Sequence, residues 1–189
     1  MLELYIVGDV YLELLRVVDK DGNNTNTILE REELHNRSLL HNEVTIYVIN
    51  NKKEVLLQKR SPNRRFCPNK LGVVAGHVSY NENPSRSAIR ELKEEIGLRI
   101  NRNDLYVLCD KYVVKERFNN HYMYSFYTVS DKKEEEFKVQ REELSYVKWY
   151  KIEQVIDMIN NNDLSTVFKE EEIDIFSKLK DISDNLQNM

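Results

Sequence analysis

The sequence predicts a single α/β domain in which helices cover a mixed β-sheet. Runs of β-branched and aromatic residues, separated by turn residues, stand both before and after one strongly helical segment in the middle of the chain. Two further helical patterns close the chain. Strands on both sides of a central helix indicate a sheet packed between helices. At 189 residues, with no repeat or long linker, the chain can bury a core of its own.

Before the central helix the sequence predicts a strand that leads into a tight turn, and then a hairpin. Residues 11–18 read as a strand that leads into Asp19-Lys20-Asp21-Gly22-Asn23, where the Asp-Gly pair favours a tight turn. These aspartates also suggest a calcium loop, but the later ligands of such a loop are missing, so we expect a turn. Residues 44–49 and 54–59 read as a hairpin around a polar turn.

The most regular helix is predicted over residues 83–96. Asn83 is a good N-cap, a proline suits the first turn, apolar residues recur at one-turn spacing, and Gly97 ends the pattern. Strands are then expected within residues 105–114, 122–129 and 147–150, with Glu134, Glu135 and Glu136 in a solvated loop. Amphipathic spacing predicts a short helix near residues 155–159 and a last helix near residues 176–182.

The composition argues against several classes of protein. The formal net charge is −4, from 28 basic and 32 acidic residues, so no global field favours nucleic acid or an anionic membrane. The first residues lack a signal-peptide pattern, and no apolar run approaches the roughly 20 residues that cross a bilayer. Cys67 and Cys109 fit ordinary thiols in a reducing compartment. We therefore expect a cytoplasmic protein without nucleic-acid or membrane partners.

Three carboxylates on the central helix carry the strongest chemical signal. Glu91, Glu94 and Glu95 stand at positions i, i+3 and i+4, so their carboxylates share one face of the helix. Such a face is usually solvated surface, but a divalent cation would turn the mutual repulsion of these carboxylates into a binding site. Arg90 stands beside the face and can hold a carboxylate through its forked donors.

The surrounding residues give this helix a specific pattern. Gly76 is followed after five residues by Glu82, and after seven more by Arg90-Glu91-Leu92-Lys93-Glu94-Glu95-Ile96-Gly97-Leu98. This segment resembles the Nudix box, G-x5-E-x7-R-E-U-x-E-E-x-G-U with U aliphatic, at every specified position. The resemblance extends more weakly over residues 44–150. It implies a Nudix-type α/β/α sandwich with a mixed sheet.

The resemblance also implies an activity and its residues. It implies a hydrolase that uses Mg²⁺ or Mn²⁺ to cleave a phosphoanhydride bond in a small organic diphosphate, a nucleoside derivative being the first candidate. The metal ligands would be Glu91, Glu94 and Glu95, with Arg90 orienting one of them and with Gly76 and Glu82 supporting the loop. The general base would be Glu91 or a more distant carboxylate such as Glu143, which is equally well explained as a surface charge.

Basic residues before the box are the expected substrate contacts. Arg60 and Lys70, with Arg64 and Arg65 between them, suit an anionic diphosphate, although a solvated basic loop needs no function. We expect one Nudix domain with an N-terminal β extension at 1–41, a core at 42–163 and a C-terminal helix at 164–189. The family resemblance makes a homodimer one expectation. The sequence decides neither the substrate nor the number of metal ions.

Two alternative functions are less well supported by the sequence than hydrolysis. The N-terminal part resembles the branch with isopentenyl-diphosphate isomerase, in which histidines at places like His35, His41 and His77 bind metal. The isomerase needs a cysteine where this chain has Ala75, and residues 117–122 lack its acidic pair. We therefore expect His35 and His41 to be structural or to contact substrate. The other alternative, an inactive Nudix ligand-binding domain, gains no support because all three box carboxylates are present.

Overall fold

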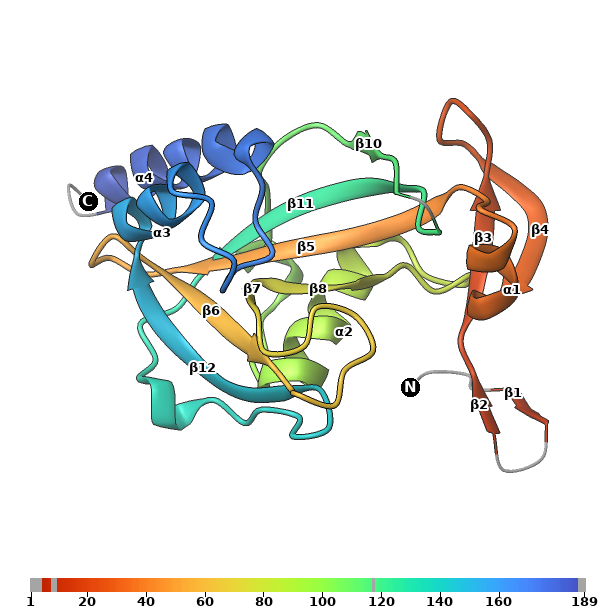
Figure 1. Ribbon diagram of the computed structural model, residues 1–189, viewed down its shortest axis with the longest axis horizontal. Helices are drawn as coiled ribbons and strands as arrows, with labels where there is room; N and C mark the ends of the chain where they lie inside the picture. The colour runs from red at the N-terminus through yellow and green to blue at the C-terminus, as the bar shows by residue number, and fades with distance from the viewer. Residues whose placement is uncertain (1–4, 8–9, 117, 187–189) are drawn as a thin grey trace.

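A mixed β-sheet lies between two layers of helices. The computed structural model describes residues 5–7, 10–116 and 118–186. Helix α2 (Pro84–Ile96) covers one face of the sheet, while α3 (Ile152–Asn160) and α4 (Ile173–Leu186) lie side by side on the other (Figure 1). The predicted α/β/α sandwich is therefore confirmed.

The sheet contains both parallel and antiparallel pairs. Its main path runs β10 (Tyr112–Val114), β11 (His121–Val129), β5 (His41–Ile49), β6 (Glu54–Arg60) and β12 (Leu144–Lys151). The pair of β5 and β11 is parallel, and the other pairs are antiparallel. Three short strands extend it, namely β7 (Leu71–Gly72) beside β6, β8 (Val74–His77) beside β5 and β9 (Tyr106–Val107) beside β11.

The alternation of β5 separates two hydrophobic cores. Val44 and Ile46 belong to the core beneath α2, whereas Tyr47 and Ile49 belong to the core beneath α3 and α4. Successive side chains of a strand point to opposite faces, so one strand supplies both layers. Because α2 packs directly on the central strand through the fully buried Leu92, its position relative to β5 and β8 is set by the core.

Both ends of α2 lie where the sequence predicted them. The side chain of Asn83 accepts a hydrogen bond from the backbone N–H of Arg86 at 3.0 Å, which caps the first turn. The helix ends at Gly97, whose φ of 69° is a left-handed conformation that glycine adopts without strain. A Cβ added to Gly97 would also lie 2.8 Å from the Cβ of Lys138, which is too close for two carbon atoms.

The N-terminal part forms a separate layer at one end of the sheet (Figure 1). It contains β1 (Tyr5–Val7), β2 (Val10–Leu12), β3 (Leu14–Val18), β4 (Asn24–Glu30) and the short helix α1 (Arg31–Asn36). The predicted turn joins β3 to β4, and Asp19 Oδ1 accepts backbone hydrogen bonds from Asp21 and Asn23, both at 2.9 Å. The sequence did not predict α1, which the fully buried Leu34 anchors.

Three predicted segments differ from the structure. The single strand expected over residues 11–18 is divided between β2 and β3, which belong to different sheets. The strand expected over residues 105–114 is split into β9 and β10, because Leu108 turns into the core beneath α4 and donates its N–H to Ser125. The expected acidic loop is a 3-10 helix, Glu134–Glu136, and Glu134 accepts the backbone N–H of Trp149 at 2.8 Å. Two other 3-10 helices span Arg102–Asp104 and Glu170–Glu172. Within the described residues, every helix is too short or too polar to cross a membrane.

Candidate active site

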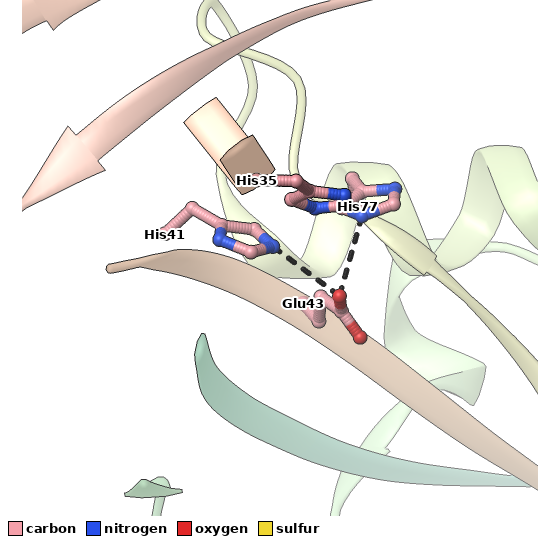
Figure 2. A group of neighbouring side chains, drawn as sticks. All are labelled: His35, His41, Glu43 and His77. Atoms are coloured by element: carbon pink, nitrogen blue, oxygen red, sulfur yellow. Dashed lines mark hydrogen bonds and ion pairs between the residues drawn. The ribbon is translucent and has the colours of Figure 1, made fainter. Parts of the chain in front are cut away.

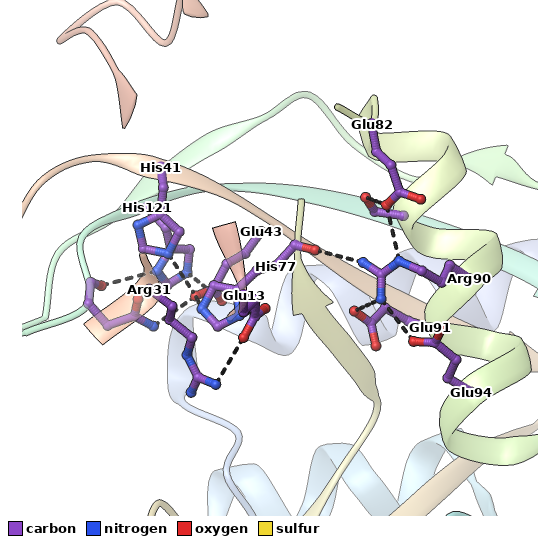
Figure 3. Close-up of polar contacts among 12 residues, drawn as sticks. Glu13, Arg31, His41, Glu43, His77, Glu82, Arg90, Glu91, Glu94 and His121 are labelled. Carbon is purple, nitrogen blue, oxygen red and sulfur yellow. Dashed lines mark hydrogen bonds and ion pairs between the residues drawn. The ribbon is translucent and has the colours of Figure 1, made fainter. Parts of the chain in front are cut away.

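Arg90 holds the carboxylates of the central helix in place. Its Nε donates to Glu82 at 3.1 Å, and its Nη1 donates to Glu91 at 2.8 Å and to Glu94 at 3.0 Å. Its Nη2 donates to the backbone oxygen of His77 at 3.1 Å, so the arginine also ties the helix to β8 (Figure 3). One guanidinium therefore links the loop, the helix and the sheet.

Gly76 leaves the space that Glu91 occupies. A Cβ built on Gly76 would lie only 2.1 Å from Oε1 of Glu91 and 2.3 Å from its Cδ. A side chain at this position would therefore displace the carboxylate of Glu91 from the place it occupies against the strand. Its position on β8, beside the central strand β5, brings the loop and the helix face together.

Glu95 and Glu91 are carboxylates in an environment that resists their charge. Glu95 is 5% exposed, and its Oε2 has no hydrogen-bond partner within the part of the chain that the structure describes. Burial, followed by the charge of Glu91, raises the pKa of Glu95 well above its usual value. Burial also raises the pKa of Glu91 to about 7, against the opposing charge of Arg90.

The basic residues before the box border the same carboxylates. The pKa of Arg60 is below its usual value because of burial and the charge of Arg64, and the charge of Glu95 opposes this shift. The guanidinium of Arg60 is therefore within electrostatic reach of both Arg64 and Glu95. Its Nε donates to the backbone oxygen of Phe66 at 3.1 Å, and its backbone N–H donates to that of Lys70 at 2.9 Å.

Glu143 lies at the same edge of the site. It pairs with Arg64 at 3.2 Å, and its charge adds to the raised pKa of Glu95. The structure thus brings together the predicted box carboxylates with Arg60 and Glu143, whereas Lys70 is joined to them through the backbone of Arg60.

All four histidines of the sequence lie in one cluster beside this site. The register of the sheet brings three of them together, because His41 of β5 pairs with His121 of β11 and Glu43 of β5 pairs with His77 of β8. His35 comes from α1 and completes the cluster, with neighbouring ring centroids 5.1 to 5.9 Å apart (Figure 2).

Two carboxylates neutralise the cluster. Despite its burial, Glu43 has a pKa well below its usual value, because the ion pair with His77 and the hydrogen bond with His41 favour its charged form. Burial lowers the pKa of His77, but Glu43 and Glu13 outweigh it and raise that pKa to about 9. Burial and the neighbouring histidines lower the pKa of His35 to about 4.

Sequence reasoning missed the two carboxylates of this cluster, Glu43 and Glu13. One signal was available for Glu43, since a polar residue stands two positions after His41 in a strand otherwise rich in apolar residues, and residues two apart share a face. No comparable signal marks Glu13, which reaches His77 at 3.1 Å from the N-terminal extension.

The fold and the site define a class of protein: an α/β/α sandwich whose carboxylate-bearing helix is held by one arginine against a glycine of the neighbouring strand. The chain belongs to the NUDIX domain family, whose family model matches residues 39–169.

Relatives and solved structures agree with this assignment. The chain is 28% identical over 156 residues to Nudix hydrolase 3 of Arabidopsis thaliana, covering 78% of this chain and 20% of that protein. It is 29% identical over 99 residues to the isopentenyl-diphosphate Delta-isomerase of Pectobacterium atrosepticum, covering 51% and 55%. The crystal structure of DR0079 from Deinococcus radiodurans superimposes with a TM-score of 0.65 at 18% identity, covering 88% and 99%. The chain thus spans about a fifth of the length of the Arabidopsis thaliana relative and about half of the length of the Pectobacterium atrosepticum relative.

Proposed function

We propose that this chain is a divalent-metal-dependent hydrolase that cleaves a phosphoanhydride bond in a small organic diphosphate, first of all a nucleoside derivative. The observation that carries the proposal is that Arg90 holds Glu91 and Glu94, and Gly76 makes room for Glu91, while the charge of Glu91 acts on the buried Glu95 of the same helix. The membership of the NUDIX family supports it.

The residues present fit a hard divalent cation such as Mg²⁺ or Mn²⁺. Oxygen ligands are what these ions prefer, and Glu91, Glu94 and Glu95 would supply them. The unpartnered Oε2 of Glu95 and the raised pKa values of Glu91 and Glu95 are the features expected of a site in which positive charge is needed. When bound, such an ion supplies charge that neutralises phosphate oxygens and lowers the pKa of a coordinated water.

The side chains divide the remaining tasks. Arg90 fixes Glu91 and Glu94 in orientation, while Glu82, which accepts from both Arg90 and Ser87, holds the loop against the helix. Arg60 is placed to meet the phosphates of a substrate, because its guanidinium is within electrostatic reach of Glu95.

Two carboxylates are candidates for the general base. Glu91 is the first candidate, since a pKa of about 7 suits proton transfer near neutral pH. Glu143 is the second, because its charge acts on Glu95 at the edge of the same site. Replacing each by glutamine and comparing the pH dependence of turnover would distinguish them.

The test is a product assay with nucleotide sugars, dinucleotides, ADP-ribose, coenzyme A and isopentenyl diphosphate, with Mg²⁺ or Mn²⁺. We expect metal-dependent cleavage of at least one of them, and a loss of about 100-fold or more in Glu94→Gln. Glu135→Gln, an exposed carboxylate outside the site, is the matched control and should keep full activity. Binding without cleavage across the panel would instead indicate an inactive ligand-binding domain.

The histidine cluster keeps isomerisation of isopentenyl diphosphate as a second candidate. His35, His41 and His77 do converge, as the isomerase resemblance requires. Ala75 still offers no proton donor beside Gly76, which places this candidate behind hydrolysis. Formation of dimethylallyl diphosphate in the same panel would reverse that order. A cytoplasmic location and a homodimer stay predictions.

A further inference from the structure

A cavity lies between the N-terminal extension and the core of the domain. Its volume is about 290 Å³, at the lower end of the range of small-ligand sites. The extension contributes Arg16 of β3 and residues 22–24, and the core contributes Asn42 of β5, Tyr124 of β11 and the loop that leads into α2. The carboxylates proposed above to bind metal are not among the described residues that line this cavity.

The amide of Asn42 is buried beside this cavity without a full set of hydrogen bonds. Asn42 is 9% exposed, and its Oδ1 has no hydrogen-bond partner within the described residues. Because side chains alternate along β5, Asn42 points to the same face as Val44, which packs beneath α2. A buried amide oxygen without a partner destabilises the folded chain, and a ligand that donates to it would remove this cost.

Tyr124 supplies a flat surface near Asn42. Strand β11 is parallel to β5 and Tyr124 lies opposite Val44, so Tyr124 and Asn42 point to the same face. Lys111 Nζ lies 5.9 Å from the centroid of the Tyr124 ring and donates to the backbone oxygen of Gly22 at 3.2 Å. The turn of the extension is thus held beside a half-buried ring, which suits stacking on a planar ligand.

Arg16 brings charged donors to the cavity in a fixed orientation. Its Nε and Nη2 donate to the backbone oxygen of Tyr80 at 3.3 and 3.1 Å, and its Nη1 donates to that of Thr25 at 3.0 Å. These bonds use three of the five N–H groups of the guanidinium. The other N–H groups suit a ligand with ring nitrogens or carbonyl oxygens as acceptors.

We propose that this cavity binds a nucleobase, with Tyr124 stacked on the ring, Asn42 paired with its polar edge and Arg16 donating to an acceptor of the ring. A side-chain amide presents a donor beside an acceptor, which matches the neighbouring donor and acceptor of a base edge. Stacking tolerates every base, so Asn42 and Arg16 would set the preference among bases. The site does not rest on the proposed hydrolysis.

The first experiment measures binding of adenosine, guanosine, cytidine and uridine to the full chain in EDTA by titration calorimetry. These probes carry no phosphate and EDTA removes divalent ions, so the carboxylate site of α2 is not tested. We expect saturable binding of one equivalent of at least one nucleoside. Tyr124→Leu should weaken it about tenfold, whereas Tyr106→Leu, at an exposed tyrosine of β9, should not change it. No saturable binding of any nucleoside would overturn the site.

A second variant separates binding from a structural role. Leucine has the shape of asparagine without its polar atoms, so Asn42→Leu should bind the nucleoside about tenfold more weakly. The same variant should unfold at a higher urea concentration, because it removes a buried acceptor without a partner. A structural asparagine would instead give a less stable variant. Unchanged nucleoside affinity in folded Asn42→Leu or Tyr124→Leu would overturn the proposal.

The base could come from the hydrolysed substrate or from a separate nucleoside, and kinetics distinguish these sources. If it belongs to the substrate, Tyr124→Leu should raise the KM of a cleaved nucleoside derivative by about the factor by which it weakens nucleoside binding. An unchanged KM would assign the cavity to a separate ligand. If no diphosphate is cleaved, hydrolysis fails as a function, while binding of nucleosides in EDTA still decides the site.

Discussion

The carboxylate site of α2 and the histidine cluster lie side by side but are assembled in opposite ways. The first takes its main side chains from one helix and the loop before it, joined by Arg90. The second takes them from α1, β5, β8 and β11. They meet at His77, whose backbone oxygen accepts from Arg90 and whose ring belongs to the cluster (Figure 3). Local sequence can specify the first, whereas the second exists only if distant strands pair in the right register.

The largest expected difference concerns the stability of the two regions. Leu92 of α2 and Leu34 of α1 are both fully buried. Leu92→Ala should lower the free energy of global unfolding by about 3–4 kcal/mol, because it opens a cavity in the main core. Leu34→Ala should mainly loosen the N-terminal extension, with a smaller loss of global stability. Urea unfolding and hydrogen exchange would measure both, and equal global losses would contradict the separation.

The next effect separates the two sites through a single atom. Gly76→Ala places a Cβ 2.1 Å from the original position of Glu91 Oε1, so the carboxylate must move. We expect hydrolysis to fall about 100-fold, since a misplacement of about 1 Å has that consequence. The moved atoms end a flexible side chain, so the midpoint of urea unfolding should change little. Full activity in this variant would show that the close approach is not required.

A smaller effect is expected at the residue that links the sites. Arg90→Lys keeps the charge but cannot donate to Glu82, Glu91, Glu94 and the His77 carbonyl together. We expect kcat to fall about tenfold, with a loss of about 1 kcal/mol in unfolding free energy. An unchanged kcat in this variant would show that the forked donors of Arg90 are not required.

The smallest effect is a change in pH dependence. In metal-free protein the pKa of Glu91 is raised from 4.5 to about 7, so between these values the unfolded chain releases this proton and the folded chain keeps it. The contribution of Glu91 to stability therefore falls as pH rises from about 4.5 to 7. Denaturation in EDTA should show a decreasing difference between wild type and Glu91→Gln over this window. A difference independent of pH would contradict the raised pKa.

Much of the fold followed from local patterns. The ends of α2 were predicted because Asn83 and Gly97 act within one helical turn, and the Asp19 turn was predicted because its hydrogen bonds are local. The split at Leu108 and the helix α1 were not, because burial against distant elements decides them.

By itself the sequence determined the carboxylate site. The spacing of Glu91, Glu94 and Glu95 on a 3.6-residue helix places them on one face whatever surrounds them. Only the tertiary structure decided the histidine cluster, because residues 35, 41, 43, 77 and 121 converge through the pairing of β5 with β8 and β11. A register shift of one residue would turn Glu43 to the opposite face, and no local pattern specifies that register.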